Sequence, residues 1–260
     1  MELIPLASEE KEGQLVLKGF AERKWAETQN LLHLTTLLIP VVRDAEDNRS
    51  VVIQIRHERK SFPCCRDVFG GHVSLDAEFW PLLLGQSFSV EGIVEAAAMR
   101  EANEELRLQR GAAYEPYDVA RDRLYQVGAT GQARWDGPGN IERSTVFLVP
   151  IPENCRLCPM DNVGIDFFAV ETELYEWLKL RTEFNANVQY AYKDRAQAAK
   201  AGCATNRQSW QFADGVARIL LDDPLFTEVD TAIRSLPISA FAAVQTEQNQ
   251  PVQRTAKRRR

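Results

Sequence analysis

The chain has 260 residues, of which 45% are hydrophobic and 26% are charged, so it can bury a sizeable core. Its formal net charge of -6 argues against nucleic acid or an anionic membrane as a general partner, although a local basic groove is compatible with it. Apolar runs such as Leu37–Val42 are far too short to span a bilayer, which excludes a membrane helix.

Cysteine content and the start of the chain favour a reducing compartment. The five cysteines are interpreted as free thiols, and the acidic start MELIPLASEEKEGQ lacks the apolar run of a signal peptide. We therefore expect a cytoplasmic protein. Cys155 and Cys158 have the spacing of half a zinc site, but zinc needs four ligands and no second pair is evident.

The first half of the chain predicts two strands and one helix. Residues 1–30 mix charged and apolar positions, and we assign them to an N-terminal extension. The apolar runs Leu34–Val42 and Val51–Arg56 predict strands on either side of a charged turn. A basic loop then leads to a pair of glycines. The segment Val90–Leu108 is rich in Ala, Glu and Leu and predicts a helix.

The second half predicts further strands and then helices. The expected strands are Leu124–Thr130, Ser144–Pro150 and Asp166–Val170, and the expected helices are Glu171–Leu180, Gln208–Leu221 and Thr227–Leu236. We assign residues 181–245 to a C-terminal helical extension and 246–260 to a disordered basic tail. Strands that flank a helix, with further helices elsewhere, favour an α/β fold with a mixed sheet.

Three acidic residues of the first helix form the most informative pattern. Glu101, Glu104 and Glu105 stand at positions i, i+3 and i+4, so their carboxylates project from one helix face. Like charges within one turn repel unless a cation neutralises them. Hard oxygen ligands suit Mg²⁺ or Mn²⁺, which leave positions open for water and phosphate. For this segment alone, a solvated acidic face is the alternative.

The loop before this helix carries candidate substrate-binding residues. Gly70 and Gly71 follow an apolar pair, and paired glycines permit positive φ angles and a close approach of backbone amides to a diphosphate. Arg56 and Lys60, in the basic stretch upstream, are candidate phosphate contacts. An exposed basic loop is the alternative for these two side chains.

These features together resemble the Nudix box, G-x5-E-x7-R-E-U-x-E-E-x-G-U, in which U is a bulky aliphatic residue. The opening glycine would be Gly71, and the core of the box is matched by Arg100, Glu101, Glu104 and Glu105. The resemblance implies a Nudix-type α/β/α sandwich over residues 31–180. The chain departs from the box in a longer segment before the helix. We place the insertion at 74–90, and its apolar content suggests packing or a substrate lid.

The resemblance implies a magnesium-dependent pyrophosphohydrolase that cleaves a nucleoside diphosphate linked to another moiety. It places the metal, Mg²⁺ or Mn²⁺, on Glu101, Glu104 and Glu105. Arg100 can pair with Glu104 four residues on and fix its orientation, and we count Arg100 and Glu101 as the catalytic candidates. Acids elsewhere that could serve as the base instead are Glu142, Asp161 and Asp166. The expected partner is a small diphosphate substrate, and a homodimer is compatible with the sequence.

Two other functions stay open at this point. The GGHV turn and His33 also resemble the isopentenyl-diphosphate isomerase branch of the Nudix superfamily, which implies a catalytic cysteine just before its Gly-His pair. Here that position is Gly70, with Cys64 and Cys65 upstream, so hydrolysis is favoured. His33 and His72 would be either metal ligands or ordinary hydrogen-bonded histidines. The third interpretation is a non-catalytic ligand-binding Nudix protein, against which the intact acidic cluster speaks.

Overall fold

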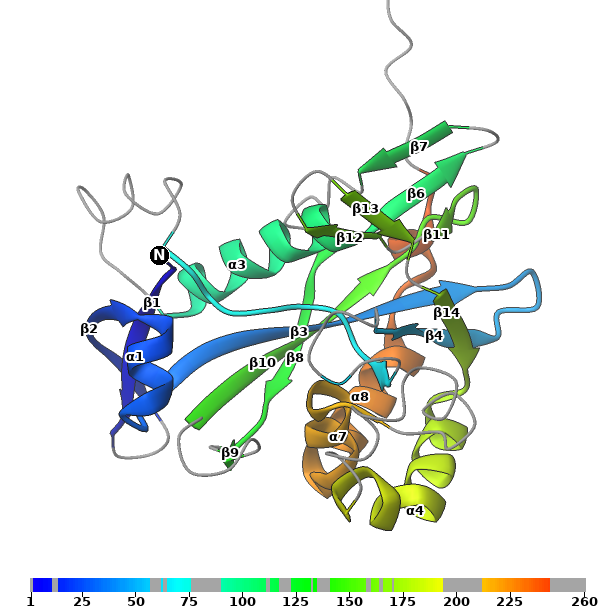
Figure 1. The fold of residues 1–260 in the computed structure, drawn as a ribbon. Helices are drawn as coiled ribbons and strands as arrows, with labels where there is room; N and C mark the ends of the chain where they lie inside the picture. The colour runs from blue at the N-terminus through cyan, green and yellow to red at the C-terminus, as the bar shows by residue number, and fades with distance from the viewer. Residues whose placement is uncertain are drawn as a thin grey trace, which may run out of the picture.

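A mixed β-sheet with helices on both faces forms the body of the protein (Figure 1). The computed structural model describes residues 2–10, 14–56, 62, 65–75, 90–110, 113–116, 123–131, 133–134, 141–157, 160–163, 166–169, 171–193 and 212–243. The elements of the first half are β1 (Leu3–Glu9), β2 (Leu15–Glu22), α1 (Arg23–Thr28), β3 (His33–Arg43), β4 (Arg49–Ile55), β5 (Arg66–Asp67), α3 (Val90–Glu105), β6 (Arg107–Arg110), β7 (Ala113–Pro116) and β8 (Tyr125–Ala129). Those of the second half are β9 (Ala133–Arg134), β10 (Ile141–Pro150), β11 (Arg156–Leu157), β12 (Met160–Val163), β13 (Asp166–Ala169), β14 (Glu171–Tyr175), α4 (Trp177–Lys193), α7 (Asp214–Leu221), α8 (Asp223–Ser235) and the 3-10 helix η3 (Ile238–Phe241).

The long strand β3 is the centre of the main sheet. The strands run in the order β14-β4-β3-β1-β2, and β10 pairs with β3 as well. The β10–β3 pair is parallel, from Glu142 opposite His33 to Pro150 opposite Val41. Strand β4 pairs antiparallel with β3, and β14 pairs antiparallel with β4. Every residue of β3 from His33 to Val41 is buried, as expected for a strand covered on both faces.

Alternate residues of β3 face two separate cores. Leu37, Ile39 and Val41 belong to the core that contains side chains of α4, α7 and α8. Leu34 and Leu38 belong to the other core, where α3 packs. Successive side chains of a strand point to opposite faces, so both faces of the sheet are covered by helices. The predicted α/β/α arrangement around a mixed sheet is confirmed (Figure 1).

All five predicted strands are confirmed, but helix α3 is shorter than predicted. The strands β3, β4, β8, β10 and β13 coincide with expected strands. Helix α3 ends at Glu105, and Arg107 already begins strand β6 instead of continuing a helix to Leu108. The Arg107 guanidinium donates to the carbonyl oxygen of Asn103 at 2.7 Å, in the last turn of α3.

The predicted helix Glu171–Leu180 is wrong in its first half. Glu171–Tyr175 forms strand β14, which pairs antiparallel with β4, and helix α4 begins only at Trp177. Strand β4 has backbone donors and acceptors that require a neighbour on this side, and β14 supplies it. Tertiary pairing therefore overrides the local helix preference of this segment.

Both predicted extensions join the same folded body. Strand β1 pairs with β2 and meets β3 at Leu6 opposite His33, so residues before 30 continue the main sheet. Near the C-terminus α7 and α8 confirm two predicted helices, although residues 208–211 of the first lie outside the described residues. The Asp222 side chain caps α8 by accepting from the amide of Leu225 at 3.1 Å.

Several predicted features fall where the chain is not described. These are nearly all of the insertion at 74–90, the side chains of Lys60, Cys64 and Cys158, and the basic tail 246–260. Among the described helices, none is long and apolar enough to cross a membrane.

Phe241→Ala tests whether the C-terminal segment belongs to the core. The Phe241 side chain is fully buried within the cluster that lies under α7 and α8. We expect the substitution to lower the free energy of unfolding by about 3–5 kcal/mol, measured by urea denaturation. Ile238→Ala in the same 3-10 helix is the control, because Ile238 is 58% exposed and should cost less than about 0.5 kcal/mol. Equally small losses of unfolding free energy in both variants would contradict the placement of Phe241 in the core.

Candidate active site

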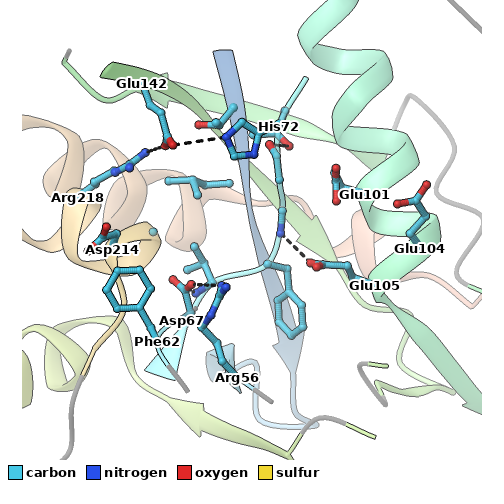
Figure 2. A pocket seen from close by; sticks show the side chains of 18 of the residues that line it. Arg56, Phe62, Asp67, His72, Glu101, Glu104, Glu105, Glu142, Asp214 and Arg218 are labelled. Atoms are coloured by element: carbon cyan, nitrogen blue, oxygen red, sulfur yellow. Dashed lines mark hydrogen bonds and ion pairs between the residues drawn. The ribbon is translucent and has the colours of Figure 1, made fainter. Parts of the chain in front are cut away.

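A pocket of about 830 Å³ lies between α3, the Gly70–Gly71 turn, β10 and the start of α7 (Figure 2). This volume falls within the range of roughly 300–1,000 Å³ that is common for ligand pockets. The structure brings together at its wall almost all predicted site residues: Arg56, Gly70, Gly71, Arg100, Glu101, Glu104 and Glu105. Lys60 lies outside the described residues.

The glycine turn is fixed to both β3 and α3. The amide of Gly70 donates to Glu105 Oε2 at 2.9 Å, which ties the turn to the acidic helix. Gly70 has a φ of +118°, and a Cβ at this position would lie 2.1 Å from the carbonyl oxygen of Thr36. Only glycine fits this backbone, so the turn lies directly against β3.

Glu101 lies against the second glycine of the turn. A Cβ on Gly71 would lie 2.7 Å from Glu101 Oε1, so the missing side chain leaves the space that this carboxyl group occupies. Glu101 is 8% exposed. Burial and the charge of Glu105 raise the pKa of Glu101 to about 7, although Arg100 lowers it in part. A carboxylate with a pKa near neutrality suits the role of a general base.

Arg100 holds the acidic side chains in place. Its guanidinium donates to Glu101 Oε1 at 2.8 Å, to Glu104 Oε2 at 3.0 Å and to the carbonyl oxygen of His72 at 3.0 Å. The predicted pairing of Arg100 with Glu104 is therefore present. Through the His72 carbonyl the same side chain also connects α3 to the glycine turn.

The three glutamates offer the oxygen ligands that suit a hard divalent cation, although in this structure their ligand atoms do not all lie within 4.8 Å of one another. Glu101, Glu104 and Glu105 come from one helix face and line one pocket, so their donor set consists of oxygen atoms alone (Figure 2). Burial is the main reason that the pKa of Glu101 is raised, and the charge of Glu105 adds to it. A bound Mg²⁺ or Mn²⁺ would lower that pKa, because it would stabilise the charged carboxylate.

A second group of possible metal ligands lies beside the first. Glu27, His33 and His72 offer ligand atoms that all lie within 4.8 Å of one another, and the two imidazole rings stack with centroids 5.3 Å apart. Both Nε2 atoms are buried without a hydrogen bond in the described part of the chain. His33 Nδ1 lies 3.0 Å from the carbonyl oxygen of Leu31, which orients its Nε2 toward the group. Burial lowers the pKa of His72, favouring the neutral form that ligates metals.

Glu142, a candidate base in the sequence, is an ionised partner of Arg218 and lies beside two histidines. Its carboxylate accepts a hydrogen bond from Arg218, and its Oε1 lies 3.5 Å from His72 Nε2 and 3.7 Å from His33 Nε2. Burial opposes ionisation, but the two histidines and the charge of Arg218 hold the pKa of Glu142 well below its usual range. So weak a base is a poor acceptor for the proton of an attacking water.

The other two acids proposed as bases, Asp161 and Asp166, belong to β12 and β13. Their side chains lie outside the described part of the structure.

Sequence reasoning missed the residues that the two ends of the chain contribute to the pocket. Glu27 comes from α1, and Asp214 and Arg218 come from α7. One signal was present: Arg218 is a lone charge in the apolar run GVARILL, and a buried arginine needs an anionic partner. Glu27 and Asp214 stand in no recognisable pattern.

Comparisons with known proteins give only weak structural matches. No protein-family model and no curated protein matches this chain. A Nudix hydrolase from Alicyclobacillus acidocaldarius is 11% identical over 70% of this chain and 97% of its own, with a TM-score of 0.40. The Nudix domain of Shewanella oneidensis NrtR, solved with ADP ribose, is 15% identical over 67% and 87%, with a TM-score of 0.32.

A MutT/nudix family protein from Enterococcus faecalis is 14% identical over 56% of this chain, with a TM-score of 0.32. The match covers about half of the length of that protein, namely 52%. All three matches carry the Nudix name, but at these identities and TM-scores they say nothing about activity, which is inferred below from the sequence and the pocket.

Proposed function

We propose that this chain is a Nudix-superfamily pyrophosphohydrolase that uses Mg²⁺ or Mn²⁺ to cleave a nucleoside diphosphate linked to another moiety. The hydrogen bond from the Gly70 amide to Glu105 carries the proposal, because it joins the glycine turn and the three-carboxylate face at one pocket. The Nudix-box spacing of Arg100, Glu101, Glu104 and Glu105 supports it independently of the structure. We expect the enzyme to work in the cytoplasm.

Each side chain has a distinct role in this proposal. Glu101, Glu104 and Glu105 would hold the cation, which when bound supplies positive charge to the diphosphate and lowers the pKa of the attacking water. Glu101 either takes its place as a ligand or accepts the proton of that water. Arg100 keeps Glu101 and Glu104 in place. Arg56, at the wall of the pocket, contacts a phosphate group.

Isomerisation of an isoprenoid diphosphate has less support. Cys65, one of the two cysteines upstream of the glycine turn, is buried and is not among the residues that line the pocket. Burial raises the pKa of its thiol to about 12, so it stays protonated and is a poor proton acceptor. Cys64 lies outside the described residues.

Glu104→Gln and Glu105→Gln test the carboxylate face. A panel of nucleotide sugars, dinucleotide polyphosphates, damaged nucleotides and capped RNA, assayed with Mg²⁺, first identifies a substrate. Each substitution should then lower kcat at least about tenfold, because a bound metal lowers the activation barrier by several kcal/mol. The control is Glu91→Gln, an exposed residue in the first turn of the same helix that does not line the pocket.

The control variant should keep the kcat of the wild type. Circular dichroism should show that all three variants are folded. Turnover like that of the wild type in both Glu104→Gln and Glu105→Gln at saturating Mg²⁺ would overturn the assignment.

Metal binding should be visible as stabilisation even without a substrate. Millimolar Mg²⁺ should raise the Tm by roughly 5 °C, because a cation that binds only the folded state stabilises it by mass action. Replacing Glu101, Glu104 and Glu105 together with Gln should abolish this shift. His33→Asn should leave it intact, because nitrogen ligands suit transition metals rather than Mg²⁺. A Mg²⁺ shift that disappears in His33→Asn but persists in the triple variant would place the ion at the histidine group instead.

A further inference from the structure

Asp67 connects three parts of the pocket wall that are far apart in the sequence. Its side chain is 6% exposed. Oδ1 accepts hydrogen bonds from the amides of Val68 at 3.0 Å and Val216 at 2.9 Å, and Oδ2 accepts from Arg56 Nη1 at 2.7 Å. One carboxylate therefore links the end of β4, the strand before the glycine turn and the first turn of α7 (Figure 2).

The first turn of α7 is shaped to fit this carboxylate. A Cβ on Gly215 would lie 2.6 Å from Asp67 Oδ1, so only glycine allows the helix to come this close. The amide of Ala213 also donates to the carbonyl oxygen of Arg66 at 2.8 Å. Helix α7 in turn brings Arg218 to the pocket, where it donates to Glu142 and to Ser144 Oγ.

The acidic helix is fixed by other contacts. Glu105 is tied to the Gly70 amide, and Arg100 is tied to the His72 carbonyl. None of the hydrogen bonds that we describe for Asp67 involves α3. A change at Asp67 can therefore alter the wall between β4 and α7 while leaving the carboxylate face in place.

We propose that Asp67 is a positioning residue that sets the Arg56 guanidinium, and with it phosphate binding, at the wall between β4 and α7. The proposal rests on the proposed function, in which Arg56 contacts a phosphate group. A charge-assisted hydrogen bond to a buried carboxylate holds the planar guanidinium in one orientation, so little side-chain entropy is lost when phosphate binds. Asp67 itself does not need to touch the substrate.

Asp67→Asn separates the two tasks of this side chain. Asn keeps a carbonyl oxygen for the amides of Val68 and Val216, but it turns an NH₂ group toward Arg56, where two donors would face each other. The KM and the Kd for methylenediphosphonate with Mg²⁺, measured by calorimetry, should each rise about tenfold. The kcat should change less than about threefold, and the Tm should stay close to that of the wild type.

Two further variants test the path through Arg56. Arg56→Gln should raise KM and the methylenediphosphonate Kd as much as Asp67→Asn does, and the double variant should show no additional rise, because both act on the same guanidinium. Asp67→Ala should also lower the Tm by several degrees, because the amides of Val68 and Val216 lose their acceptor.

The matched control is Asp44→Asn. Asp44 likewise accepts from two backbone amides, those of Glu46 and Asn48, but it does so on an exposed turn away from the pocket. It should leave KM and the methylenediphosphonate Kd unchanged.

Unchanged KM and Kd in Asp67→Asn would overturn the proposal and leave Asp67 a purely structural residue. A wild type that does not bind methylenediphosphonate would overturn it as well. Failure of the proposed function would give a different result, because the wild type would then hydrolyse no diphosphate on the panel. The Kd for methylenediphosphonate would still test Asp67 and Arg56, since this ligand is bound without being cleaved.

Discussion

The hydrogen bond between the Gly70 amide and Glu105 is the contact on which the pocket depends. It joins α3 to a turn that can exist only with glycine, because any side chain at Gly70 would collide with the Thr36 carbonyl on β3. Strand, turn and helix are therefore fixed relative to one another before any ligand binds. Preorganised carboxylates of this kind can take up a cation without further rearrangement of the backbone.

Charge is distributed unevenly across the pocket. On α3, the guanidinium of Arg100 bonds two carboxylates, while burial and the charge of Glu105 raise the pKa of Glu101 to about 7. On β10, Arg218 and two histidines hold Glu142 ionised. The Nε2 atoms of those histidines and Glu27 also offer ligand atoms within 4.8 Å of one another, and a cation bound there would take the place of their contact with Glu142. The pocket thus combines an oxygen-only group with a mixed nitrogen and oxygen group.

The two ends of the chain build walls of this pocket rather than separate appendages. Helix α1 supplies Glu27, and α7 supplies Asp214 and Arg218. The N-terminal strands continue the main sheet, while the C-terminal helices cover one face of it with apolar side chains. Both segments therefore stabilise the sheet that carries the glycine turn and also shape the pocket.

The sequence by itself determined the strands β3, β4 and β10, the helix α3 and the face that carries Glu101, Glu104 and Glu105, because these depend on local periodicity and spacing. Only the tertiary structure decided that Glu171–Tyr175 is a strand and that Arg218 and Asp67 belong to the site. Arg218 and Glu142 are 76 residues apart, and Val216 and Asp67 are 149 apart. Contacts over such separations follow from the packing of helices on the whole sheet, and a local signal such as the lone charge of Arg218 in an apolar run does not specify the partner.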